Sequence, residues 1–145
     1  MITIEVRGLP APQGSKRPVR LGSGKIGMVE MSKAVGPWRE AIRSETQRAM
    51  NGDGPLAGPV HVTAIFTLPR PRSHYRTGLM SDFLKPTAPV APCVKPDLDK
   101  LLRALLDGLT AGGVWTDDAQ VAQVAARKEY GQPGCRIEIS RMVAS

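Results

Sequence analysis

Apolar residues recur at helical spacing in the second half of the chain and mark one helix. Six leucines follow this spacing, namely Leu98, Leu101, Leu102, Leu105, Leu106 and Leu109,. Pro96 and the favourable N-cap residue Asp97 stand just before the stretch, and Gly112 and Gly113 follow it as a stop signal,. The pattern predicts a buried amphipathic helix between Asp97 and Gly112.

Alternation of apolar and polar residues predicts strands on either side of a second helix. Residues 2–7 and 59–68 alternate, and the longer run directs one set of side chains inward, namely Val60, Val62, Ala64, Phe66 and Leu68,. Residues 26–30 are a candidate short strand. Pro37 suits the first turn of a helix that runs to about Met50, which we expect to be structural,.

The end of the chain has the pattern of two further strands. Residues 120–130 and 135–143 flank a Gly-Gln-Pro-Gly turn and predict a hairpin,. With 145 residues, 41% of them hydrophobic, the chain can build one core but not two,. We therefore expect a single domain over residues 1–145, a small α/β fold with a mixed sheet of four or five strands and two main helices.

Composition restricts the class of partner. The formal net charge of +7 favours nucleic acid, and because only 4% of residues are aromatic, charge rather than extensive stacking must carry the binding,. Cys93 and Cys135 form no CxxC motif, so a zinc site is not expected and both are expected to be reduced thiols of a cytosolic protein,. No apolar run approaches the 18 residues of a membrane span,. We expect neither membrane association nor an organic cofactor.

Two stretches rich in Gly and Pro concentrate the positive charge. Residues 8–25 carry Lys16, Arg17, Arg20 and Lys25 without an acid, and residues 69–96 carry Arg70, Arg72, His74, Tyr75, Arg76, Lys85 and Lys95 against Asp82 alone. Such runs are either solvated or bind phosphate. We expect both loops to be mobile in the free protein and the second to become ordered on DNA.

Two acidic pairs flank the leucine helix, Asp97 with Asp99 and Asp117 with Asp118. Taken singly, they are explained as helix caps, turn residues or members of an ion-pair ladder. If the chain after Gly113 turns back alongside the helix, however, the four carboxylates would meet. Such a cluster would hold Mg²⁺ or Mn²⁺, and the basic loops would recruit a polyanion to it.

The run KPDLDKLLRALLDGL followed by WTDDAQV resembles the signature of the RusA-type Holliday junction resolvases, also called crossover junction endodeoxyribonucleases. The resemblance implies a homodimer that hydrolyses a phosphodiester of branched DNA with Mg²⁺, which Mn²⁺ can replace, and leaves a 5′-phosphate and a 3′-hydroxyl. It places the metal-binding acids at Asp97, Asp99 and Asp118, with Asp117 beside them. The family's catalytic lysine falls on Arg103, and arginine can clamp a phosphate but is a poor proton donor.

The charge of the two basic loops, together with the resemblance for the first loop and for Lys128, suggests the DNA-binding residues, namely Lys16, Arg17, Arg20, Arg70, Arg72, Arg76, Lys95, Lys100 and Lys128. Lys100 stands where many members of the family have asparagine. The resemblance implies a cytoplasmic protein encoded by a bacterium, prophage or phage. Two other functions stay open from the residues alone. One is a DNA-binding module that grips junctions without cutting, as arginine at position 103 suggests; the other is a basic RNA-binding protein whose acids are only caps.

Overall fold

Four strands form one mixed sheet in the computed structural model, which describes residues 1–14, 16–20, 26–30 and 33–144. The strand order is β1-β6-β4-β5; β6 runs antiparallel to both of its neighbours, and β4 is parallel to β5. The strands of this sheet are β1 (Ile2–Arg7), β4 (Val60–Leu68), β5 (Val121–Tyr130) and β6 (Gly134–Arg141). The small α/β domain with a mixed sheet is confirmed.

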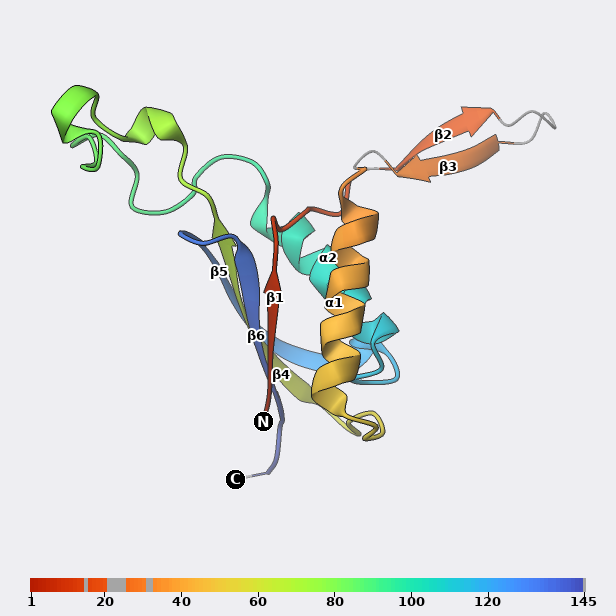
Figure 1. Ribbon diagram of the computed structural model, residues 1–145. Helices are drawn as coiled ribbons and strands as arrows, with labels where there is room; N and C mark the ends of the chain where they lie inside the picture. Colours follow the sequence, from red (N-terminus) through yellow and green to blue (C-terminus); the bar gives the residue numbers. More distant parts are fainter. Residues whose placement is uncertain (15, 21–25, 31–32, 145) are drawn as a thin grey trace.

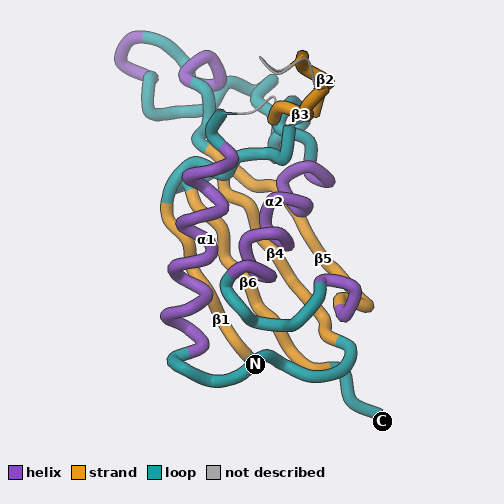
Figure 2. Tube along the Cα trace, turned by 90° about the vertical axis from the view of Figure 1, so that its right-hand side faces the viewer, coloured by secondary structure: helices purple, strands orange, loops and turns teal. Residues whose placement is uncertain are grey.

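Two helices, α1 (Val35–Met50) and α2 (Leu98–Ala111), cover one face of this sheet (Figure 1; Figure 2). All five inward residues predicted for β4 are buried, and so are Leu101, Leu105 and Leu109 of α2. The stop signal is confirmed as well, because α2 ends at Ala111 and Gly113 has a φ of +84°. Neither helix in the described part of the chain has the length and apolar content needed to span a membrane.

Glycines allow α1 and α2 to approach each other closely. A Cβ added at Gly108 would lie 2.8 Å from the Cβ of Ile42, and one added at Gly112 would lie 2.5 Å from the Cβ of Thr46. Ile42 and Thr46 are both fully buried, so they have little room to move. The glycines of α2 thus fix the position of the helix that carries the first acidic pair.

Gly108→Ala is expected to lower the free energy of unfolding by about 1–3 kcal/mol, because the added methyl group overpacks the contact with Ile42,. Gly36→Ala is the matched control, since Gly36 lies in α1 with nothing near the position of its Cβ. That change should be neutral or stabilise the protein by up to about 1 kcal/mol through helix propensity. Urea denaturation measures both; equal stability of the two variants would contradict the proposed role of Gly108.

The predicted hairpin of the last two strands is wrong. Strand β4 lies between β5 and β6 and pairs with both, parallel to the first and antiparallel to the second. The short connection after Tyr130 crosses the end of β4, where the Gly131 N–H donates to the Leu68 carbonyl at 3.0 Å. The turn residues indicate that the chain reverses after β5, but they do not show that β4 lies between β5 and β6.

Two segments extend beyond the end of the domain at which α2 begins (Figure 1). One contains a hairpin of β2 (Lys16–Arg20) and β3 (Ile26–Glu30); β3 was expected, but β2 replaces part of the loop predicted over residues 8–25. The other, residues 69–96, contains two single-turn 3-10 helices, Arg72–His74 and Gly78–Met80, and a bridge between Tyr75 and Leu84. The mobility of both segments stays a prediction.

Candidate active site

Asp97 begins α2 but does not cap it through its side chain. Its backbone is extended, with φ −70° and ψ 140°, and its carboxylate makes no capping hydrogen bond. Asp99 follows in the first turn, and both residues are exposed. Lys100 lies nearby, with its Nζ 3.8 Å from Oδ2 of Asp97. The explanation of Asp97 as a simple cap therefore does not hold, and its carboxylate is available to bind a cation.

Asp117 and Asp118 occupy different roles in a short 3-10 turn (Asp118–Gln120). Asp117 is the cap, since its Oδ1 accepts from the Ala119 N–H at 2.8 Å and its own N–H donates to the Gln120 side chain at 3.3 Å. Desolvation, a hydrogen bond with Asp117 and the charges of Asp117 and Asp107 raise the pKa of the Asp118 carboxyl, although that residue is exposed. A cation bound beside Asp118 would favour the charged form of its carboxyl.

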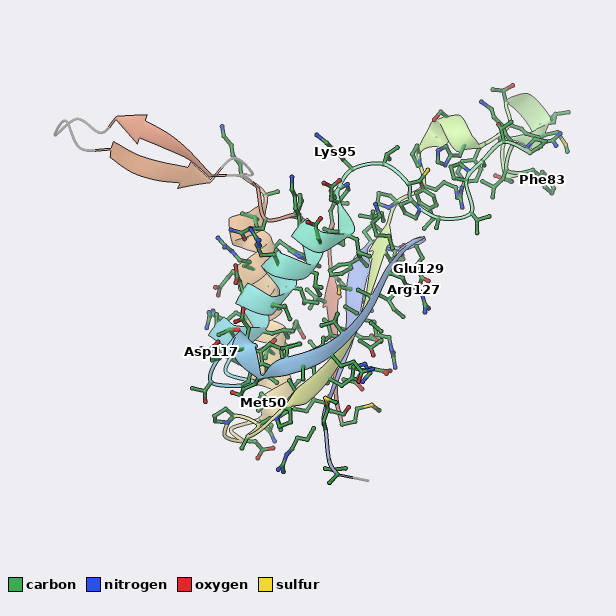
Figure 3. All side chains as sticks on the ribbon, turned by 180° about the vertical axis from the view of Figure 1, so that it is seen from behind. Met50, Phe83, Lys95, Asp117, Arg127 and Glu129 are labelled. Atoms are coloured by element: carbon green, nitrogen blue, oxygen red, sulfur yellow. The ribbon has the colours of Figure 1, made fainter. Side chains whose placement is uncertain are left out.

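The two acidic pairs lie at opposite ends of α2, so the expected cluster of four carboxylates in one chain is wrong. The helix has 14 residues, which at the usual rise spans about 21 Å. Figure 3 shows Asp117 at one end of α2 and Lys95, which precedes the first pair, beyond the other. Within the described residues, no three acidic, histidine or cysteine side chains are grouped so that they could hold a metal ion.

The reason lies in where the chain turns back. After α2, Trp115 bridges to Leu56, and β5 starts at Val121 beside the first residue of β4. The chain does return along the sheet, but Asp118 precedes this strand. The residue of β5 that reaches the start of α2 is Lys128, whose Nζ donates to the carbonyls of Val94 and Pro96 at 2.9 Å each.

Lys128 therefore fixes the backbone that leads directly into Asp97. A lysine ammonium has three donors, and two of them are used within the chain, one on either side of Lys95. The role assigned to Lys128 from the sequence was contact with DNA. The structure gives it a second task, which is to hold the first acidic pair in place.

If the chain cuts DNA as the resemblance implies, Lys128→Met is expected to slow cleavage about tenfold or more while changing affinity for DNA little, because it loosens the acidic pair rather than a phosphate contact,. Lys95→Met is the contrasting variant, since Lys95 is exposed. Loss of one phosphate contact lowers the salt dependence of binding by about one unit. Binding titrations at several salt concentrations, with single-turnover cleavage, measure both; a lowered salt slope in Lys128→Met would show direct DNA contact instead.

Asp107 is a further acid near Asp118, and the sequence did not suggest that the two interact. It lies on α2, interacts with the Asp118 carboxyl, and its Oδ2 is 3.7 Å from Nη1 of Arg39. The same Arg39 nitrogen donates to Oε1 of Gln13 at 3.0 Å. The available signal was the i, i+4 spacing of Asp99, Arg103 and Asp107, which is equally typical of a solvated ion-pair ladder,.

Arg103 lies on α2 between the two acidic ends, four residues after Asp99 and four before Asp107. Its side chain is exposed, and within the part of the chain that the structure describes it makes no hydrogen bond or ion pair. A guanidinium in this state can bind two oxygens of one phosphate group. Arg103, one helical turn after Asp99, therefore has its charge available for a phosphate held near that residue.

The other predicted DNA-binding residues differ in how free their charges are. Arg70 is used within the chain: its Nη1 donates to the Pro89 carbonyl at 2.8 Å and lies 3.3 Å from Nδ1 of His74, and its guanidinium lies 4.1 Å from the centre of the Tyr130 ring. Arg72, Arg76 and Lys95 are exposed. The side chains of Lys16, Arg17 and Arg20 lie outside the described residues; only their backbone, in β2, is placed.

The donor set at the start of α2 fits a magnesium ion. Mg²⁺ is commonly held by one or two carboxylates and completes its six ligands with water and substrate phosphate oxygens. Asp97 and Asp99 are two such carboxylates, exposed and close to a free cation that would favour phosphate binding. Asp118 of the same chain lies toward the other end of α2, beside Asp107.

A family model described as Endodeoxyribonuclease RusA matches residues 8–140. The match covers both acidic pairs, Arg103 and Lys128. Comparison with the curated proteins finds no match.

Proposed function

The chain belongs to the RusA endodeoxyribonuclease family, and from this premise we propose that it is a Mg²⁺-dependent endonuclease that resolves four-way DNA junctions by paired symmetric nicks. Resolution of Holliday junctions places it in DNA recombination and repair. The observation that carries the proposal is the Asp97 carboxylate, which stands at the exposed start of α2 without a capping bond, beside Asp99.

The chain's own residues would divide the work of phosphodiester hydrolysis. Asp97 and Asp99 would hold the ion, which supplies an activated water and stabilises negative charge on the phosphate oxygens. Arg103 would bind the non-bridging oxygens of the scissile phosphate and neutralise the charge that develops there. Lys128 would hold the backbone before Asp97 in place through the carbonyls of residues 94 and 96, and so keep Asp97 positioned beside Asp99.

The separation of the acids supports a homodimer. Because Asp97 and Asp118 lie at opposite ends of α2, both can serve one metal only if two chains contribute. A four-way junction has near-twofold symmetry, and its resolution needs two opposed nicks, which a twofold dimer supplies. We therefore propose that Asp97 and Asp99 of one protomer act with Asp118 of the partner subunit, so that each dimer has two shared sites.

Arg103 is expected to tolerate lysine but not alanine. If it only neutralises the phosphate, Arg103→Lys should keep much of the activity, whereas Arg103→Ala should lose about 10²–10³ in rate, the usual cost of one electrostatic donor. Arg48→Ala is the control, because Arg48 is an exposed arginine at the far end of α1. Single-turnover cleavage of a labelled junction measures the rates; an unchanged rate in Arg103→Ala would exclude the proposed role.

The proposed function is tested with a labelled four-way junction, a duplex, a single strand and an RNA junction, each with Mg²⁺ and with EDTA. We expect symmetric nicks in the DNA junction with Mg²⁺ and binding without nicks in EDTA. Tight junction binding without cleavage in either condition would indicate a non-cutting module. Preference for RNA would indicate the RNA-binding alternative.

A further inference from the structure

A cavity of about 460 Å³ opens directly beside Asp97. Its volume lies in the range of small-molecule binding pockets. Asp97 is one of its lining residues, whereas Asp99 and Arg103 are not. The walls are mostly apolar, and they come from the segment after β1, from the end of β4 and from the residue before Asp97, namely Leu9, Pro10, Ala11, Pro12, Leu68 and Pro96.

Both walls of the cavity are tied to their surroundings by hydrogen bonds. On one side, the Gln13 N–H donates to the Lys100 carbonyl at 3.0 Å, and the buried Gln13 side chain accepts from Arg39 at 3.0 Å. On the other side, Lys128 holds the backbone around Pro96 through two carbonyls. These hydrogen bonds hold both described walls of the cavity in place.

Few of the residues that line the cavity are charged. They are Lys95, which is exposed, Asp97 and Lys100, and most of the remaining lining is apolar. A matching ligand has flat apolar faces and carries negative charge at its attachment point. A nucleobase on a DNA backbone has this form, since the base can enter the apolar space while its phosphates meet the two lysines.

We propose that this cavity takes one unpaired nucleobase next to the phosphodiester that is cut; the proposal rests on the proposed function and adds a base-binding subsite to it. A base in a continuous duplex must lose its pairing and stacking to enter, whereas a base at a branch point has already lost part of them and enters at lower cost. The cavity thus makes cutting depend on the branch. Because its interior has few polar groups, it recognises that a base is unstacked more than which base it is.

The test uses four-way junctions that carry 2-aminopurine at single positions around the cut, bound in EDTA so that no cleavage occurs. This base analogue fluoresces more strongly when it leaves the stack. We expect the full chain to raise the fluorescence at one position beside the cut by several fold, and to leave a 2-aminopurine duplex unchanged. Cleavage of the unlabelled junction with Mg²⁺ is measured in parallel.

Leu9→Trp is the variant that fills the cavity, and because Leu9 is 61% exposed the change spares the core. It should abolish the fluorescence change and reduce junction cleavage at least tenfold. Val143→Trp adds the same side chain on the exposed C-terminal segment and should retain both signals. Thermal melts followed by circular dichroism show whether each variant is folded.

An abasic site at the reporting position gives a measurement that does not depend on the fold of a variant. It should weaken junction binding by the wild-type chain at least fivefold and leave binding by Leu9→Trp unchanged. Normal cleavage without a 2-aminopurine signal at any position, or with full activity in Leu9→Trp, would overturn the base pocket and leave the nuclease standing. Failure to bind the junction at all would overturn both.

Discussion

Asp97→Asn is expected to abolish junction cleavage while leaving junction binding intact or tighter, and Asp99→Asn is expected to do the same. Asparagine keeps the shape of the side chain but removes the charge that holds the ion, so the loss should exceed the cost of about 10²–10³ for a single electrostatic group. Removal of a negative charge beside the DNA also lowers repulsion of the phosphates. Cleavage should therefore be lost while binding is kept or improved, whereas a misfolded variant would lose both.

The structure adds a reason to expect that the fold survives these changes. The Asp97 side chain makes no capping hydrogen bond and is exposed, so α2 does not depend on it for its start. Asp53→Asn is the matched control, because Asp53 is an exposed acid in the turn after α1, away from the start of α2. Gel-shift titrations in EDTA and cleavage with Mg²⁺ measure the two properties. Cleavage at the wild-type rate by both variants would show that Asp97 and Asp99 do not bind the catalytic metal.

Local patterns in the sequence predicted the main elements well, because each pattern is caused by burial on one face. The leucines of α2 and the alternation of β4 both follow from packing between the helices and the sheet, and both were identified correctly. Strand β2 was missed because Pro18 and the surrounding glycines are typical of loops, while its pairing with β3 depends on contacts between strands,.

The arrangement of the site could be predicted only in part, because it depends on contacts between distant residues. The sequence places Asp97 at the start of α2 but does not show that β5 lies beyond β4, or that Lys128 on this strand reaches the carbonyl of Pro96. Spacing also gave no sign that Arg70 would bind the Pro89 carbonyl and stack on Tyr130. The sequence identified the cationic side chains, but only the fold shows which of them are bonded within the described part of the chain and which are exposed.

The distance between the acidic pairs has a consequence for mixed dimers. If each site joins Asp97 and Asp99 of one protomer to Asp118 of the partner subunit, a dimer of one Asp97→Asn chain and one Asp118→Asn chain keeps one intact site, because both substitutions fall in the other. If each site uses the acids of a single chain, the same dimer has none. Each variant alone should be inactive in either case, so activity that appears on mixing separates the two arrangements.

Mixed dimers, purified through two different tags, are expected to nick a supercoiled cruciform plasmid into open circles at up to about half the wild-type rate per dimer, since one of two sites remains. Paired cuts would give linear product, and a single working site cannot make them. Asp97→Asn mixed with Asp99→Asn is the control, because these substitutions damage both sites in either arrangement, so this mixture should stay inactive. Nicking by the control mixture would contradict the need for Asp97 and Asp99 in either arrangement. No nicking by the Asp97→Asn and Asp118→Asn mixture would show that the acids of two chains do not share a metal, and Asp118 at the far end of α2 would then belong to a separate acidic group with Asp107.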